Sequence, residues 1–181
     1  MKLSIVATMY RSVSTVDEFV RRICDEAKKI TNDYELILVD DGSPDDSLQS
    51  ALTLQKSNPH LSVIELSRNF GHHKAMMTGL EHSKGDLVFL IDIDLEESPE
   101  LLNTFYAEMT HGKWDVVYGV QQTRNGTAFF GNSNKSFSHL ISSWVHANSQ
   151  IALMPTYGKL VNHGRTKRWH FETSVAVNFF H

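Results

Sequence analysis

The chain has 181 residues, enough for one domain with its own core, and its 41% hydrophobic content is ordinary for a soluble globular protein. Its single cysteine, Cys24, excludes an internal disulfide framework and a cysteine-rich zinc site. The net charge of −4 is spread unevenly, because residues 1–112 carry 10 basic and 19 acidic side chains, whereas residues 113–181 carry 7 and 2. The basic second part suits contact with phosphates or an anionic membrane surface, or it is a solvated face.

Short apolar runs alternate with stretches of helical spacing along the first two thirds of the chain. We expect strands at residues 3–9, 34–39, 61–66, 87–91 and 116–120, and helices at residues 15–30, 46–55, 71–82 and 99–110. This alternation is typical of βαβ units. It predicts an α/β fold, a three-layer α/β/α sandwich around a mostly parallel sheet. After about residue 130 this alternation of strand-like and helix-like segments stops. Residues 155–181 show neither the helical nor the strand period of hydrophobic residues.

The sequence predicts neither a secretory signal nor a membrane span. Met1 and Lys2 lead directly into a strand-like run, and no stretch reaches the roughly 18 to 20 apolar residues that cross a bilayer. The best candidate, residues 137–154, is interrupted by histidines, an asparagine and several serines. We therefore expect the protein to be in the cytoplasm, either free or at the cytoplasmic face of the membrane.

The most informative feature is the segment Asp86–Asp94, in which an apolar run ends in Asp92 and Asp94. Side chains two positions apart in an extended chain point the same way, so the two carboxylates lie together where a buried strand stops. Ligands of open α/β sheets bind at this edge. The pair needs a hard divalent cation, a cationic ligand or a shared proton, unless both are solvated turn residues.

Two other predicted strands end in polar residues at the same edge of the sheet. The first ends in Thr8-Met9-Tyr10-Arg11 and the second in Asp40-Asp41-Gly42-Ser43. A tyrosine ring can stack on a base, and a carboxylate can accept a hydrogen bond from a base or a ribose. Together these groups suit a nucleotide diphosphate, although each one alone is equally explained as a turn or packing residue. Three further residues can add positive charge: Arg68, Lys74 and Arg124.

Five segments in this order resemble the family-2 nucleotide-sugar glycosyltransferases: KLSIVATMY, YELILVDDGSPDDS, LSRNFGHHKAMMTGL, GDLVFLIDIDLEESPELL and DVVYGVQQTR. The chain is most similar to bacterial polyprenyl-phosphate glycosyltransferases and dolichyl-phosphate-mannose synthase, over about residues 2–128. The resemblance implies a GT-A fold with a Rossmann-like nucleotide-binding sheet. It also implies inverting transfer of a sugar from a nucleotide-diphosphate sugar, in cell-envelope polysaccharide biosynthesis.

The resemblance implies roles for individual residues. The second aspartate of Val-Asp-Asp-Gly-Ser, here Asp41, binds the base, and Tyr10 lies beside it. Asp92 contacts nucleotide and metal, and Asp94 is the direct ligand of Mg²⁺ or Mn²⁺. Arg124 sits near the phosphates. Three residues from the strand-end argument complete the predicted nucleotide-binding set: Thr8, Arg68 and Lys74.

The chain departs from the family in two places. The first strand usually ends in Pro-x-Tyr-Asn-Glu, but here the acid is replaced by Ser12. Family members continue with an amphipathic helix, acceptor-site residues and often two membrane spans. In this part of the chain only residues 137–141 still resemble the family, and only faintly. We therefore divide the chain into a nucleotide-sugar-binding domain, residues 1–128, and an atypical tail, residues 129–181. We hypothesise that the tail is a truncated or frame-slipped acceptor region, which the flanking coding DNA would test.

In the expected reaction an acceptor oxygen attacks the anomeric carbon and a nucleoside diphosphate leaves, while the metal offsets the developing charge. A sugar-hydroxyl acceptor needs a general base, but after residue 115 the only acidic side chain is Glu172, so the catalytic residue stays unassigned. A polyprenyl phosphate needs little or no base, so a lipid-phosphate acceptor is favoured. We expect no nucleic-acid partner.

Two alternatives remain open. A non-catalytic remnant of such an enzyme would bind a nucleotide sugar with metal but without turnover. A phosphorelay receiver domain also carries acids at its strand ends, but its acidic pair belongs on the first strand and it needs a strand-borne lysine that is not seen here. We do not expect His72 and His73 to bind a metal, because adjacent histidines point to different sides of a helix.

Overall fold

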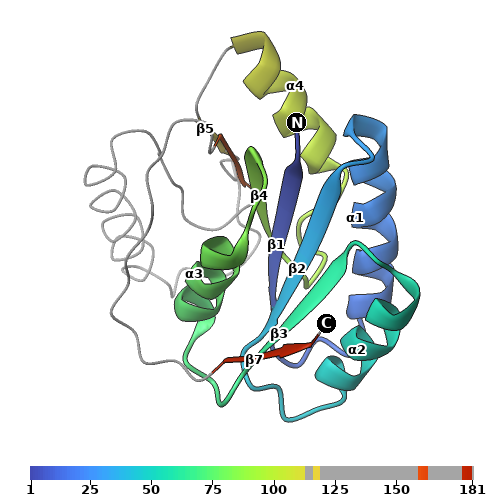
Figure 1. Ribbon diagram of the computed structural model, residues 1–181, viewed down its shortest axis with the longest axis vertical. Helices are drawn as coiled ribbons and strands as arrows, with labels where there is room; N and C mark the ends of the chain where they lie inside the picture. The colour runs from blue at the N-terminus through green and yellow to red at the C-terminus, as the bar shows by residue number, and fades with distance from the viewer. Residues whose placement is uncertain (113–115, 119–158, 163–176, 181) are drawn as a thin grey trace, which may run out of the picture.

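The computed structural model describes residues 1–112, 116–118, 159–162 and 177–180, which form one mixed sheet with helices on both faces (Figure 1). Its strands lie in the order β5-β6-β4-β1-β2-β3-β7. They are β1 (Leu3–Met9), β2 (Tyr34–Asp40), β3 (Leu61–Leu66), β4 (Leu87–Asp92), β5 (Val116–Tyr118), β6 (Lys159–Asn162) and β7 (Val177–Phe180). The helices are α1 (Val16–Ile30), α2 (Ser47–Ser57), α3 (His72–His82) and α4 (Leu101–Gly112).

The predicted α/β fold is confirmed. β1 pairs in parallel with both β2 and β4, and β2 pairs in parallel with β3. Every predicted helix is present, and its ends differ from the prediction by two residues or fewer. β5 is described only to Tyr118, so residues 119 and 120 of the predicted strand lie outside the described residues. The proposed domain boundary at residue 128 also lies outside them and stays a prediction.

Two short strands were not predicted. β6 pairs antiparallel with β4 and β5, and β7 pairs antiparallel with β3. Both come from the last 23 residues of the chain, in which the sequence has no clean period. Each has four residues and extends an edge of the parallel part of the sheet.

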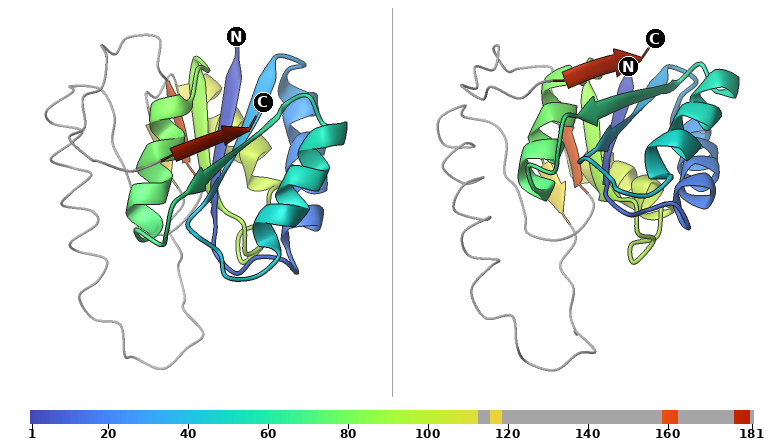
Figure 2. Two further views of the ribbon diagram at one scale, coloured as in Figure 1. Left: turned by 60° about the horizontal axis from the view of Figure 1, so that its bottom comes forward. Right: turned by 90° about the horizontal axis from the view of Figure 1, so that it is seen from below.

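Side chains that alternate along the parallel strands build a separate core on each face of the sheet. The helices lie on both sides of the sheet (Figure 2). α1, α2 and α4 cover one face, where Phe19 and Phe89 are fully buried. α3 covers the other face and approaches it closely, because a Cβ on Gly79 would lie 2.3 Å from Val6 Cγ1. Burial on both faces explains why these strands read as continuous apolar runs. No described helix is both long and apolar enough to cross a bilayer.

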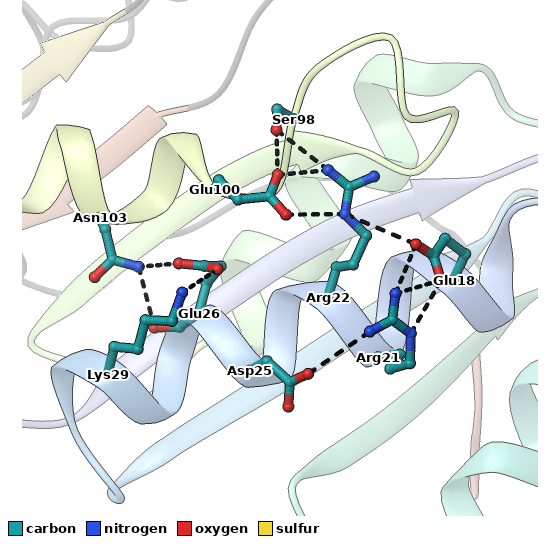
Figure 3. Close-up of polar contacts among 9 residues, drawn as sticks. All are labelled: Glu18, Arg21, Arg22, Asp25, Glu26, Lys29, Ser98, Glu100 and Asn103. Atoms are coloured by element: carbon teal, nitrogen blue, oxygen red, sulfur yellow. Dashed lines mark hydrogen bonds and ion pairs between the residues drawn. The ribbon is translucent and has the colours of Figure 1, made fainter.

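Polar contacts between α1 and the start of α4 fix the far end of the loop that follows β4 (Figure 3). Arg22 Nε donates to Glu100 Oε1 at 2.9 Å, and the same guanidinium donates to Ser98 Oγ at 3.3 Å. Asn103 donates from its side-chain amide to the carboxylate of Glu26. The loop that carries the second aspartate of the Asp-x-Asp pair is therefore anchored at its α4 end.

The Arg22 contact predicts how stability depends on pH. Hydrogen bonds from Arg22 and Ser98 lower the pKa of Glu100 from 4.5 to about 2. Because folding depresses this pKa, the stabilisation is complete above pH 4.5 and is lost as the pH falls towards 2. Since 46% of the Glu100 side chain is exposed, solvent screening limits the contribution to about 0.5 to 1 kcal/mol.

We expect Glu100→Gln to lower the free energy of unfolding at pH 7 and to flatten its pH dependence between pH 4.5 and 2. Denaturant titrations at several pH values measure both effects. Glu108→Gln removes an exposed carboxylate within α4 and is the matched control. An unchanged pH dependence in Glu100→Gln would show that the Arg22 contact does not stabilise the fold.

Candidate functional site

The carboxyl ends of β1, β2 and β4 surround a cavity of about 280 Å³. The strand register explains why they meet, because Thr8 of β1 stands beside Asp92 of β4 and Met9 stands beside Asp40 of β2. Asn69 and His72, on either side of the point where α3 begins, also line the cavity. Its lining includes five of the predicted site residues: Thr8, Tyr10, Asp41, Asp92 and Asp94.

The Asp-x-Asp pair places two carboxylates at the carboxyl end of β4. Asp94 is exposed, and its Oδ1 accepts a hydrogen bond from the Glu96 N–H at 2.9 Å. Leu95 has a φ of +63°, in the left-handed region, which tightens the turn after the pair. Burial raises the pKa of Asp92, and the Asp94 and Glu96 carboxylates raise it further, while His72 opposes the rise. The edge of the sheet thus carries an excess of negative charge.

A divalent cation suits this pair of acids, because carboxylate oxygens are preferred ligands of Mg²⁺ and an added positive charge relieves their repulsion. Among the residues that the structure describes, no group of three or more histidine, cysteine, aspartate and glutamate side chains is arranged to hold an ion. A cation at Asp92 and Asp94 would therefore need further oxygen ligands from a phosphate or from water.

Asp41 has a structural role that the sequence did not indicate. It is only 3% exposed, and its carboxylate oxygens accept hydrogen bonds from Phe70 N–H at 2.7 Å and Gly71 N–H at 3.0 Å. The next residue, Gly42, has a φ of +66°, and a Cβ there would lie 2.5 Å from the backbone carbon of Arg68. The end of β2 is thus fastened to the loop that leads into α3. A carboxylate has about four lone-pair sites, so Asp41 can still accept a hydrogen bond from a ligand.

Tyr10 is an exposed aromatic residue that lines the cavity. Its side chain is 44% exposed, and the Arg11 guanidinium carbon lies 5.4 Å from the centre of its ring. Arg11 has a φ of +56°, which is uncommon for a residue with a side chain. Such strained positions cluster at binding sites. The Tyr10 ring is available to stack on a planar ligand.

Two of the predicted cationic residues lie beside Phe70 and do not line the cavity. The Arg68 guanidinium carbon is 4.7 Å and Lys74 Nζ is 5.8 Å from the centre of the Phe70 ring. Arg124 lies outside the described residues. The nucleotide-binding roles of these three residues stay predictions.

His72 also belongs to the site, although it was not among the residues predicted from the sequence. Its Nδ1 lies 2.9 Å from Thr8 Oγ1, and its Nε2 lies 3.6 Å from Asp92 Oδ1. His72 is the first residue of α3, directly after Gly71. That position is the signal that would have found it, because helices of a parallel sheet begin near the edge where ligands bind.

Residues 4–175 match the family model described as Glycosyl transferase family 2, so the chain belongs to this family. A protein of Mycobacterium tuberculosis (strain CDC 1551 / Oshkosh), described as "Putative glycosyltransferases", is 60% identical over 126 residues. The aligned part is 70% of this chain and 37% of that protein, so the chain spans little more than a third of its relative. The family match confirms the resemblance found in the sequence and leaves the phosphorelay receiver domain without support.

Solved glycosyltransferase structures share the fold. TarS 1–349 of S. aureus has a TM-score of 0.55 and 24% identity, over 75% of this chain and 40% of that chain. The mannosyltransferase PcManGT from Pyrobaculum calidifontis, in complex with GDP-Man and Mn²⁺, has a TM-score of 0.57 and 20% identity, over 66% and 35%. TarS 1–349 in complex with UDP-GlcNAc has a TM-score of 0.52 and 23% identity, over 73% and 39%. These similarities confirm the GT-A fold.

The double hydrogen bond of Asp41 gives a prediction about stability. Asp41→Asn replaces one acceptor oxygen with an NH₂ group, so a backbone N–H of the loop loses its acceptor. We expect the free energy of unfolding to fall by about 1 to 3 kcal/mol in the absence of any ligand.

Asp94→Asn is the matched control. Asp94 is exposed, and its contact with the Glu96 N–H needs only one oxygen, so we expect a loss below about 0.5 kcal/mol. Denaturant unfolding measures both variants. Equal stability of Asp41→Asn and the wild type would mean that the loop does not depend on this carboxylate.

Proposed function

We propose that this chain is the donor-binding part of a glycosyltransferase that moves a sugar from a nucleotide-diphosphate sugar to an acceptor, with inversion and with a divalent cation. One observation carries the proposal: a chain of family 2 gathers Tyr10, Asp41, Asp92 and Asp94 around one cavity at the carboxyl ends of its parallel strands. The complexes of PcManGT with GDP-Man and Mn²⁺ and of TarS with UDP-GlcNAc support it, because they share this fold.

The geometry suits the nucleotide part of such a donor. In the proposed arrangement the base stacks on the exposed ring of Tyr10, and a base N–H donates to a free lone pair of Asp41. The phosphates then reach Asp92 and Asp94, which would hold Mg²⁺ or Mn²⁺. Held by Asp92 and Asp94, a cation would supply positive charge that stabilises the departing diphosphate. A cavity of about 280 Å³ is at the small end for ligand sites, which fits a nucleotide better than a whole donor.

We infer that the acceptor is a polyprenyl phosphate at the cytoplasmic face of the membrane. An oxygen of its phosphate would form the new bond to the anomeric carbon, while the bond to the nucleoside diphosphate breaks and its electron pair leaves with the diphosphate. A phosphate anion needs no proton removal before it attacks, so such an acceptor requires no general base. The 7 basic and 2 acidic side chains of residues 113–181 also suit an anionic acceptor.

A thermal-shift experiment tests the donor site. UDP or GDP with MnCl₂ or MgCl₂ should raise the melting temperature, because a ligand at 100 times its Kd stabilises the folded state by about 2.7 kcal/mol. For a chain of this size that corresponds to roughly 5 to 10 °C. Asp94→Asn should lose the part of the shift that requires metal, whereas Glu108→Gln should keep the whole shift. If neither diphosphate shifts the wild type with either metal, the nucleotide assignment of the cavity is wrong.

A transfer assay tests the acceptor. With a nucleotide sugar that binds in the thermal-shift experiment, we expect the labelled sugar to move to polyprenyl phosphate and not to polyprenol, which lacks the anionic nucleophile. Labelled lipid separated from the donor by extraction measures the transfer. Transfer to polyprenol at the same rate would contradict the acceptor assignment, and donor binding without any transfer would favour the non-catalytic alternative.

A further inference from the structure

His72 presents a ring nitrogen at the acidic end of the cavity. Its side chain is 44% exposed, and its Nε2 lies 3.6 Å from Asp92 Oδ1. This distance is too long for a hydrogen bond, so Nε2 retains its capacity to bond a ligand. A group that enters between the two side chains therefore meets a nitrogen of His72 and an oxygen of Asp92.

The orientation of the His72 ring is set by Thr8. Thr8 Oγ1 and His72 Nδ1 are 2.9 Å apart, which occupies the other ring nitrogen. Thr8 and Asp92 are register partners on the adjacent strands β1 and β4, so the hydroxyl and the carboxylate stand next to each other. When the hydroxyl donates to Nδ1, the neutral imidazole carries its proton on Nε2 and faces the cavity as a donor.

The backbone before His72 is also held in place. Asp41 binds the N–H groups of Phe70 and Gly71, the two residues that directly precede it. His72 then opens α3, a helix of 11 residues, whose N-terminal end carries a partial positive charge. The ring nitrogen and the helix end therefore favour the same kind of ligand, an anion, at a place otherwise dominated by carboxylates.

His72 differs in position from the two nearby cationic residues that were predicted to bind the nucleotide. Arg68 and Lys74 lie against the Phe70 ring and do not line the cavity, whereas His72 does. Among the described residues that line it, His72 is the one basic side chain. A diphosphate bound near Asp92 and Asp94 would thus share the cavity with His72 as the basic side chain that this part of the chain supplies.

We propose that His72 donates a hydrogen bond from Nε2 to a phosphate oxygen of the nucleoside diphosphate, and that Thr8 orients the ring for this contact. The proposal rests on the proposed donor site and adds a residue that distinguishes a nucleoside diphosphate from its nucleoside. His72 contacts the ligand directly in this arrangement, and Thr8 is a positioning residue.

Binding of UDP and uridine, and of GDP and guanosine, tests the assignment. We expect His72→Asn to weaken diphosphate binding by about 10- to 100-fold, as for loss of a hydrogen bond to a charged group. Nucleoside binding should stay within about twofold of the wild type. Calorimetry measures the diphosphates and NMR titration measures the weaker nucleosides. Thr8→Val removes only the hydroxyl and should weaken diphosphate binding by several fold, with the nucleoside again unaffected.

His73→Asn is the matched control, because it changes the neighbouring histidine, which does not line the cavity. We expect it to bind both kinds of ligand within about twofold of the wild type. The titrations are run with and without Mg²⁺, and the loss in His72→Asn should appear in both conditions. A loss only with Mg²⁺ would mean that His72 acts through Asp92 and the cation, which overturns the direct contact.

Three further outcomes would overturn the proposal. If His72→Asn weakens the nucleoside and the diphosphate equally, the histidine supports the structure of the cavity and does not bind phosphate. If the wild type binds a diphosphate and His72→Asn binds it as tightly, the proposal fails while the donor site stands. If the wild type binds neither UDP nor GDP, the donor site itself fails.

Discussion

The position of β1 between β2 and β4 is the constraint on which the site depends. Parallel pairing on both sides sets Thr8 beside Asp92 and Met9 beside Asp40, so three strands end at one level. Polar groups from segments that are about 30 to 80 residues apart in the chain therefore share one edge. The two apolar cores on the faces of the sheet hold this register, because a slip by one residue would exchange the side chains between the faces.

The electrostatics of this edge follow from its composition. Asp92, Asp94 and Glu96 raise the local negative charge, and the burial of Asp92 makes that charge more costly. Asp41 instead accepts hydrogen bonds from two backbone N–H groups in the loop before α3. The same carboxylate therefore shapes the cavity and sets where α3 begins. A cation together with an anionic phosphate would complete the charge balance that the described residues at this edge leave open.

The parallel part of the fold could be predicted from the sequence because its strands are continuous apolar runs and its helices have clear spacing. β6 and β7 could not, since each has only four residues and owes its place to pairing with a distant strand. Asp92 and Asp94 were predictable from their position after a buried strand. His72 could have been noted from its position at the start of the predicted helix, but its contacts with Thr8 and Asp92 could not, because they join residues far apart in the chain.

The central claim is that the carboxyl ends of β1, β2 and β4 form one nucleotide-diphosphate site. A crystal structure of the chain with UDP or GDP and Mn²⁺ tests it most directly, because Mn²⁺ is located by its anomalous scattering. We predict that Mn²⁺ would be held at Asp94, next to the diphosphate, and that the base would lie against Tyr10. A nucleotide bound elsewhere on the chain, with no Mn²⁺ at Asp92 or Asp94, would contradict it.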